Sequence, residues 1–365
     1  MKRILITGGA GFIGSRLAQA LTDDDPDRQI MVFDSLHPQV HGHHPSPRNW
    51  SGRVQFVQAD IRDTNLLAQA VDAIDPDTVF HLAAETGTAQ SRDCISRYCD
   101  VNVTGTANLL ECLHSNAPNL QRVILASSRA VYGEGAHRNS NGQIVVPPPR
   151  SEARMRAGQF DPVDKQGSAL TPVPTSEDVG PAPVSVYGST KLMQEYLVEQ
   201  ASSGNSWRPF ILRFQNVYGP GQSMSNPYTG VLSIFCSQIL AGVSLNIYED
   251  GNIVRDFVYV DDVVRALVLA GRGEREVPGP VNIGSGAPTR ILDAATILLN
   301  LLGGSSGYQI SGQYRVGDIR FAVGDISVAR KVLDWAPQVD LRTGLGLLAN
   351  WAGKTLSDTG GHSFV

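Results

Sequence analysis

The chain has 365 residues, of which 42% are hydrophobic and 18% are charged, a balance typical of a globular protein rather than a disordered or membrane-embedded one. No run of about 20 apolar residues occurs, so we expect no signal peptide, no membrane anchor and no membrane partner. The formal net charge of −5 gives no overall attraction to a phosphate backbone, which argues against nucleic acid as a partner.

Short β-branched segments alternate with amphipathic helical segments in the first third of the chain. The segments that we expect to be strands are Ile4–Thr7, Ile30–Asp34, Val54–Gln58, Thr78–Leu82 and Arg122–Ser127. Alternation of strands and helices predicts an α/β fold with a doubly wound parallel sheet of the Rossmann type.

A long segment of different character comes next. Between Gly133 and Pro183, Pro, Gly, Ser and charged residues predominate with little periodicity, over a length that is uncommon for a simple connection. We interpret residues 134–183 as an insertion over the active site. Helical periodicity returns at Tyr187–Gln200, and a strand is expected at Phe210–Phe214.

The remainder of the chain predicts a smaller lobe that is interleaved with the first domain. Its expected elements are strands at Leu245–Tyr248 and Val281–Ile283 and helices near residues 230–241, 261–271, 290–302 and 326–334. We therefore predict a Rossmann domain at residues 1–215 that contains the insertion, a mainly substrate-binding lobe at 216–354, and a flexible tail at 355–365.

Cysteine and histidine spacing favours a cytoplasmic protein without a metal site. The four cysteines form neither a CxxC pair nor a metal finger, as expected of free thiols in a reducing compartment. The densest histidine cluster, at residues 37–44, lies among Pro and Gly and has no fixed ligand geometry. We therefore predict no bound metal.

The sequence TGGAGFIG follows the first predicted strand and begins a predicted helix. In this context Gly8 permits a tight turn, Gly11 lets the backbone approach a pyrophosphate, and Gly14 allows close packing. The helix N-terminus adds N–H donors and the positive end of its dipole. We therefore expect this turn, including Phe12 and Ile13, to bind a dinucleotide.

The type of dinucleotide is indicated by Asp34, which ends the second predicted strand. A carboxylate at this position accepts hydrogen bonds from the adenosine ribose hydroxyls. It also repels a 2′-phosphate, so the sequence predicts NAD rather than NADP.

The third and fourth predicted strands end in further cofactor candidates, because ligands of parallel sheets collect at the carboxyl ends of the strands. These candidates are Asp60, Ile61, Leu82, Ala83 and Ala84. Taken singly, they are explained as well by a helix cap at Asp60 and a packed turn at Ala83-Ala84.

Tyr187 and Lys191 are four residues apart at the start of a predicted helix and therefore share one face of it. A nearby ammonium and a positively charged nicotinamide both favour the phenolate, so we expect the pKa of Tyr187 to fall toward neutrality. The phenolate could then take a proton from a hydroxyl as hydride leaves the same carbon. Ser127 and Ser128 end the preceding strand and are expected to supply a third polar group.

Several motifs occur together along nearly the whole chain. They are TGGAGFIGS (7–15), HLAA (81–84), VNVTGT (101–106), SSRAVYG (127–133), YGSTK (187–191), LRFQNVYGPG (212–221), RDFVYVDDV (255–263) and NIGSG (282–286). In this combination the chain resembles the extended short-chain dehydrogenase/reductase family, specifically its branch of nucleotide-sugar epimerases and dehydratases.

The resemblance implies an NAD cofactor, a nucleotide-diphosphate sugar as substrate, and roles for individual residues. Asn102 and Ser127 would lie beside the cofactor, Ser128 would bind the reacting sugar oxygen, Tyr187 would be the acid and base, and Lys191 would hold the nicotinamide ribose. The substrate would be bound by Asn216, Arg255 and Arg315, with Asp318 near the nucleotide ribose. Two arginines suit a diphosphate because their forks form bidentate, charge-assisted bonds, although surface ion pairs would explain them too.

The residues after Ser128 discriminate among the reactions of this branch. The dehydratases that the chain resembles carry an acidic pair there, whereas this sequence has Arg129-Ala130. Because β-elimination then lacks its local acid and base, we predict epimerisation. The sugar of a dTDP- or UDP-(deoxy)hexose would be oxidised at C4 to a 4-keto intermediate, and hydride would return to the opposite face.

Shorter stretches narrow the resemblance further. The segments LHPQVHG (36–42), ETGTAQS (85–91), ASSRAVYGEG (126–135) and PYTGVLSIF (227–235) are similar to the dTDP-L-rhamnose 4-epimerase group. That group often carries a CxxC-like element in the insertion, whereas this chain has FDPVDKQG at 160–167.

Two other functions remain open from the sequence. The chain could be a reductase or an atypical dehydratase of the same family, or a non-catalytic NAD-binding protein, because a fold alone does not fix a function. Family relatives also commonly form homodimers through two helices per subunit, which here would be those around Ser91–Leu113 and Tyr187–Gln200.

Overall fold

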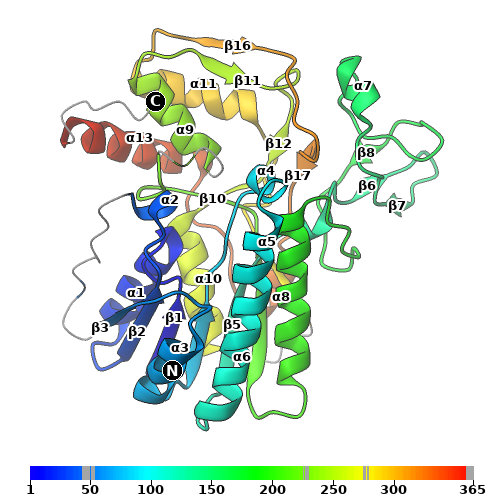
Figure 1. The fold of residues 1–365 in the computed structure, drawn as a ribbon. Helices are drawn as coiled ribbons and strands as arrows, with labels where there is room; N and C mark the ends of the chain where they lie inside the picture. Colours follow the sequence, from blue (N-terminus) through cyan, green and yellow to red (C-terminus); the bar gives the residue numbers. More distant parts are fainter. Residues whose placement is uncertain are drawn as a thin grey trace.

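The computed structural model describes residues 1–42, 50, 54–224, 226, 230–273, 277 and 279–358. At its centre lies a seven-stranded parallel sheet with the strand order β14-β9-β5-β4-β1-β2-β3 (Figure 1). Its strands are β1 (Arg3–Thr7), β2 (Gln29–Asp34), β3 (Val54–Gln58), β4 (Thr78–His81), β5 (Arg122–Ser128), β9 (Arg208–Phe214) and β14 (Val281–Ile283). The predicted doubly wound sheet is confirmed, and the chain reverses its direction of winding between β1 and β4, where such sheets bind ligands.

Helices cover both faces of the sheet. One face packs against α1 (Phe12–Asp24), α10 (Val260–Arg272) and α12 (Ser327–Leu333), the other against α3 (Thr64–Ile74), α6 (Gly105–Asn116) and α8 (Val186–Ser202). The sequence explains this packing, since buried apolar residues recur at helical spacing. The spacing is seen in α3 at Leu67, Ala70, Val71 and Ile74, and in α10 at Val263, Ala266, Leu267 and Ala270.

A smaller lobe with its own hydrophobic core lies over the carboxyl edge of the sheet (Figure 1). It contains the helices α9 (Val231–Leu240), α11 (Ile291–Leu302) and α13 (Leu341–Asp358). Short strands pair as β10 (Asn216–Tyr218) with β13 (Phe257–Tyr259), β11 (Leu245–Ile247) with β16 (Tyr308–Ile310), and β12 (Val254–Arg255) with β15 (Thr289–Arg290) and β17 (Phe321–Ala322).

The insertion forms a separate projection at one side of the molecule (Figure 1). It holds a small antiparallel sheet of β6 (His137–Arg138), β7 (Ile144–Val145) and β8 (Thr171–Pro172), together with the short helix α7 (Glu152–Arg156). The remaining short elements are the helices α2 (Pro38–His41), α4 (Thr88–Ser91) and α5 (Ile95–Tyr98), the π-helix η1 (Cys99–Thr104) and the 3-10 helix η2 (Arg129–Tyr132).

Three elements expected in the smaller lobe belong to the Rossmann domain instead. Strand β14 pairs with β9 at the edge of the central sheet, and α10 and α12 pack on that sheet. The sequence analysis assigned Val281–Ile283 and the helices near 261–271 and 326–334 to the lobe because they follow it along the chain. Their apolar faces are buried by the sheet, which decides their position.

The predicted C-terminal tail begins too early, because α13 continues to Asp358. Residues 359–365 lie outside the described residues, as do His43 and His44 of the histidine cluster and residues 227–229 of the PYTGVLSIF segment. No helix within the described ranges is both long and apolar enough to cross a membrane.

Candidate active site

The glycine-rich turn connects β1 to α1 at the carboxyl edge of the sheet. Gly8 has a φ of +69°, and a Cβ on it would lie 2.5 Å from the backbone nitrogen of Ala83, so no side chain fits there. The turn therefore lies directly against the strand end at Leu82-Ala83. The N-terminus of α1 begins at Phe12 and faces the cavity described next, as the fingerprint predicts.

A cavity of about 450 Å³ extends along the carboxyl ends of β1, β2, β3, β4 and β5. Its lining contains the predicted cofactor residues Gly8, Gly11, Phe12, Ile13, Gly14, Asp34, Asp60, Ile61, Leu82, Ala83, Ala84, Ser127, Tyr187 and Lys191. The lining also includes residues that the sequence analysis did not single out, among them Glu85 and Gln215. A glycine turn, a helix N-terminus and a long cavity are a fitting environment for a dinucleotide.

The Asp34 carboxylate is held in place by two backbone donors. Its Oδ2 accepts a hydrogen bond from the Ala10 nitrogen at 3.0 Å, and its Oδ1 accepts one from the Leu36 nitrogen at 2.8 Å. The turn that would hold the pyrophosphate and the carboxylate that would bind the ribose are therefore one rigid unit.

Asp60 does not cap the following helix, because Asp63 does so through a bond from the Leu66 nitrogen. The Asp60 carboxylate instead accepts two bonds from the Arg62 guanidinium, both at 2.8 Å. These bonds hold the pKa of the Asp60 carboxyl below its usual value. Asp60 thus remains a charged acceptor at the wall of the cavity.

Asn102 does not line the cavity. It is fully buried in η1, where its Nδ2 donates to the Thr190 hydroxyl at 2.9 Å and its Oδ1 accepts from the Glu85 nitrogen at 2.7 Å. Asn102 therefore fixes the Glu85 segment, which does line the cavity, against helix α8. That Asn102 lies beside the cofactor remains a prediction, and we propose that it acts on the cofactor site through Glu85.

Ser128, Tyr187 and Lys191 come together where β5 ends and α8 begins. Ser185 caps α8 by accepting a bond from the Gly188 nitrogen at 3.1 Å. A Cβ on Gly188 would lie 2.6 Å from the Ala130 carbonyl oxygen, so α8 can approach the end of β5 only because this residue is glycine. The close approach brings Tyr187 and Ser128 to the walls of the same cavities, where the Ser128 hydroxyl acts to lower the pKa of the Tyr187 phenol.

Burial changes the ionisation of both residues of the YxxxK motif. It raises the pKa of the Tyr187 phenol, against the effect of the hydrogen bond with Ser128, and lowers the pKa of Lys191 to about 7. The protein alone therefore does not lower the pKa of Tyr187, contrary to the expectation from the sequence. A buried lysine that is only partly protonated at neutral pH is a weak source of positive charge.

The sequence analysis missed the partner of Lys191. The lysine Nζ donates to Gln194 Oε1 at 2.5 Å, and Gln194 Nε2 donates to the Thr106 hydroxyl at 2.7 Å. Next to them His81 is fully buried, which together with Lys191 lowers its pKa to about 3, so the imidazole is neutral. The signal for Gln194 was its position three residues after Lys191, on the same helix face.

A second cavity of about 280 Å³ adjoins the first and leads toward the smaller lobe. Ser128 and Tyr187 line both cavities, and the predicted substrate residues Asn216, Arg255 and Asp318 line the second one. The Arg255 guanidinium donates to Asp318 Oδ1 at 2.7 Å.

Arg315 is not part of the lining of this second cavity, although it was expected to bind substrate. Its guanidinium lies over the Tyr248 ring, 4.8 Å from the centroid. Arg129 lines the cavity instead. The motifs alone could not show that Arg129 rather than Arg315 lines the cavity, because a sequence does not specify the direction in which a long side chain points.

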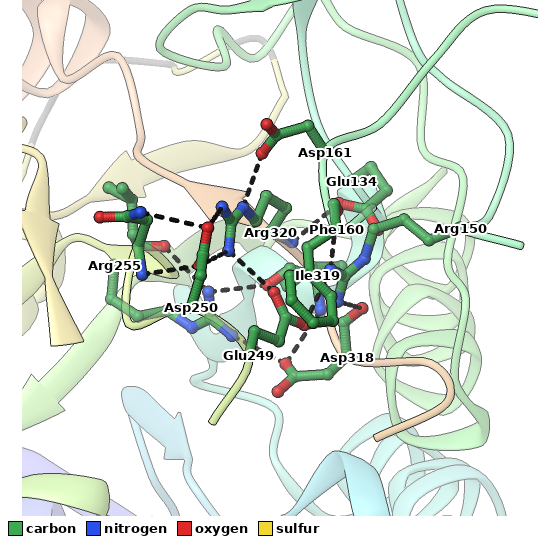
Figure 2. A network of polar contacts seen from close by, with 12 residues as sticks. Glu134, Arg150, Phe160, Asp161, Glu249, Asp250, Arg255, Asp318, Ile319 and Arg320 are labelled. Atoms are coloured by element: carbon green, nitrogen blue, oxygen red, sulfur yellow. Dashed lines mark hydrogen bonds and ion pairs between the residues drawn. The ribbon is translucent and has the colours of Figure 1, made fainter. Parts of the chain in front are cut away.

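Ion pairs attach the insertion to the smaller lobe, as Figure 2 shows. None of residues 134–183 is among the lining residues of either cavity. Arg150 of the insertion binds Glu249 of the lobe at 2.8 Å, and Arg320 of the lobe binds Asp161 of the insertion at 2.8 Å. Arg150 also binds Glu134 at 3.1 Å, and Arg320 also binds Glu249 at 2.9 Å. Arg150 also donates to the Asp318 carbonyl at 2.7 Å. Through Arg150 the insertion therefore contacts the segment that carries Asp318, the partner of Arg255. That the insertion lies over the active site remains a prediction.

Comparison with known proteins agrees with this geometry. The NAD dependent epimerase/dehydratase family model matches residues 4–152 and 165–284. The chain is 40% identical to a dTDP-L-rhamnose 4-epimerase of Burkholderia thailandensis, over 97% of this chain and 96% of that protein. It is 32% identical to a UDP-glucose 4-epimerase of Mycolicibacterium smegmatis, over 94% of this chain and 96% of that protein.

Solved structures give the same result. A UDP-glucose 4-epimerase of Thermotoga maritima with UDP-glucose matches with a TM-score of 0.78 and 30% identity, over 97% of this chain and 99% of that one. A UDP-glucuronic acid 4-epimerase of Bacillus cereus, in complex with UDP-glucuronic acid and NAD, matches with a TM-score of 0.77 and 29% identity, over 97% and 100%.

The lowered pKa of Lys191 predicts a pH-dependent stability. Between a folded pKa of about 7 and an unfolded pKa of about 10.4, the unfolded chain binds more protons at this site, so the contribution of Lys191 to stability rises with pH. We expect Lys191→Met to raise the melting temperature of the nucleotide-free protein most near pH 6.5 and much less near pH 9.5. The exposed Lys165→Met is the control, and equal shifts at both pH values would contradict the burial of a charged Lys191.

Proposed function

Because the chain belongs to the NAD-dependent epimerase/dehydratase family, we propose that it is an NAD-dependent 4-epimerase of nucleotide sugars. One observation carries the proposal: Ser128 and Tyr187 line both the cofactor cavity and the adjoining cavity that holds the substrate candidates. A hydroxyl and a phenol at this junction can handle the proton of one sugar hydroxyl while hydride moves at the same carbon.

The roles of the residues follow from this arrangement. NAD, when bound, accepts and returns hydride and adds a positive charge that opposes the effect of burial on Tyr187. Tyr187 removes the proton from the C4 hydroxyl and later returns it, and Ser128 hydrogen-bonds the same oxygen. Lys191 holds the nicotinamide ribose, and Gln194 positions the lysine Nζ.

Elimination of water has less support. The carboxylate that lines the substrate cavity among the described residues is Asp318, and it is paired with Arg255 at 2.7 Å. The 3-10 helix after Ser128 offers Arg129 and Ala130, where an elimination would need an acid and a base. An atypical dehydratase would therefore need its acid and base from elsewhere.

Net reduction and NAD binding without catalysis are also less well supported. A reductase would have to exchange its cofactor in every cycle, whereas an epimerase regenerates NAD internally. The complete set of Ser128, Tyr187 and Lys191 at one junction argues against a protein that only binds NAD.

For the substrate we propose a dTDP- or UDP-(deoxy)hexose. The relatives at 40% and 32% identity are named as epimerases of dTDP-L-rhamnose and UDP-glucose. In this chain Asn216 and Arg255 would bind the diphosphate, with Asp318 near the nucleotide ribose and Arg315 available only if its side chain leaves Tyr248. Incubation with dTDP-, UDP- and GDP-sugars, followed by NMR of the products, identifies base and sugar.

We also propose that the protein prefers NAD to NADP and acts as a cytoplasmic homodimer. The fixed Asp34 carboxylate supports the preference for NAD. The four free thiols support a reducing compartment. On α5 and α8, Ile95, Met193 and Tyr196 are 54%, 45% and 44% exposed, and a dimer interface through these helices would bury this apolar surface.

Replacing the proposed acid and base gives the first functional prediction. Tyr187→Phe removes the hydroxyl that transfers the proton, so kcat should fall by roughly 10²–10⁴ while KM stays within a few-fold. Steady-state kinetics measure both, with Tyr196→Phe on the same helix as the control. A Tyr187→Phe enzyme that keeps more than a tenth of the activity contradicts the assignment.

The proposed homodimer gives the second functional prediction. Light scattering at micromolar concentration should show a dimer for the protein and a monomer for the double variant Met193→Asp/Tyr196→Asp, because two carboxylates would be buried in the interface. Val243→Asp, at an exposed apolar position of the smaller lobe, should remain dimeric. A monomeric parent protein would reject the interface.

A further inference from the structure

Arg129 is a buried cation at the wall of the substrate cavity. It is the first residue of η2, directly after Ser128, and only 9% of its surface is exposed. Its Nη2 donates to the Gly133 carbonyl oxygen at 2.7 Å. Arg129 lines the same cavity as Arg255 and Asp318.

Within the described part of the chain, no carboxylate lies within ion-pair distance of Arg129. The two nearby acids are engaged elsewhere. Asp318 pairs with Arg255, and Glu134 binds Arg150 and accepts a bond from the Arg320 nitrogen at 2.9 Å. Burial and the charge of Arg255 lower the pKa of Arg129 to about 10, which still leaves it protonated at neutral pH.

An uncompensated buried charge is unfavourable, because the protein must remove the guanidinium from water without supplying a counterion. The other buried arginines of this region show the contrast. Arg150 and Arg320 are each surrounded by carboxylates, as Figure 2 shows. A cation that lines a cavity and has no counterion among the described residues is suited to an anion from outside the protein.

We propose that Arg129 binds an oxyanion of the nucleotide sugar, namely its diphosphate, and so determines substrate affinity. This inference rests on the proposed function. Arg129 and Arg255 repel one another across the cavity, and an anion with two charges placed between them relieves that repulsion. The guanidinium fork can form two parallel bonds to phosphate oxygens, which a lysine cannot.

The position of Arg129 links affinity to the type of reaction. Where an elimination would need a carboxyl next to Ser128, this chain places a cation, which would lower the pKa of any carboxylic acid introduced beside it. Arg129 therefore occupies the position where elimination would need a carboxyl group, and it adds a bond to the substrate.

The test compares the NAD-loaded protein with its Arg129→Met variant by calorimetric titration with dTDP and with UDP. We expect at least a tenfold loss of affinity for the tighter-binding nucleotide and a melting temperature that is unchanged or higher, since an uncompensated charge is removed. Arg129→Lys keeps the charge but lacks the guanidinium fork, so its affinity should lie between those of the parent protein and Arg129→Met. The control is Arg138→Met, which removes an exposed arginine that also donates to a glycine carbonyl.

Three results would overturn the inference. The first is an Arg129→Met affinity for dTDP and UDP within twofold of the parent protein. The second is a loss of affinity that comes with a lower melting temperature, which marks a structural role. The third is a variant that loses UDP-glucuronate but keeps UDP, because the oxyanion would then be a sugar carboxylate. A parent protein that binds neither nucleotide contradicts the proposed function itself, which the titration reveals without any turnover.

Discussion

The buried ion pair between Glu195 and Arg213 is the constraint on which the active site depends. Arg213 on β9 donates to the two Glu195 oxygens on α8 at 2.9 and 2.6 Å, and Ser127 at the end of β5 donates to the same carboxylate. Removing one partner of such a pair costs about 3–5 kcal/mol, because the other charge stays buried. The pair therefore fixes α8 against two strands, and with α8 it fixes Tyr187 and Lys191 relative to Ser128.

The same electrostatic rule separates the structural arginines from the proposed substrate-binding one. Arg150 and Arg320 are matched by carboxylates and join the insertion to the smaller lobe, which supports the wall that carries Arg255 and Asp318. Arg129 is buried to a similar degree but has no such match among the described residues. The paired arginines connect the segments around the cavity, and Arg129, which has no such pair, is one of the cavity's lining residues.

The sequence predicted those features that depend on local pattern. The glycine turn and the six strands expected for the sheet could be read from periodicity and spacing, because each depends on neighbouring residues. The proximity of Ser128 to Tyr187 was instead implied by the motifs that the chain shares with its family. The place of Val281–Ile283 in the central sheet could not be predicted from the sequence, because a short apolar strand is compatible with either domain. Nor could the contacts of Asn102 or the packing of Arg315 on Tyr248, because these bring together residues that are far apart in the sequence or turn a long side chain in a direction that the sequence does not state.

The central claim is that one proton and one hydride are exchanged at a single carbon, which deuterium at C4 of the substrate tests most directly. If Ser128, Tyr187 and Lys191 act as proposed, the label should remain at C4 in the inverted product, apart from slow leakage to solvent. In heavy water no solvent deuterium should enter C5 or C6, and no reductant should be needed. Loss of water, or solvent deuterium at C5, would instead show elimination and contradict the account.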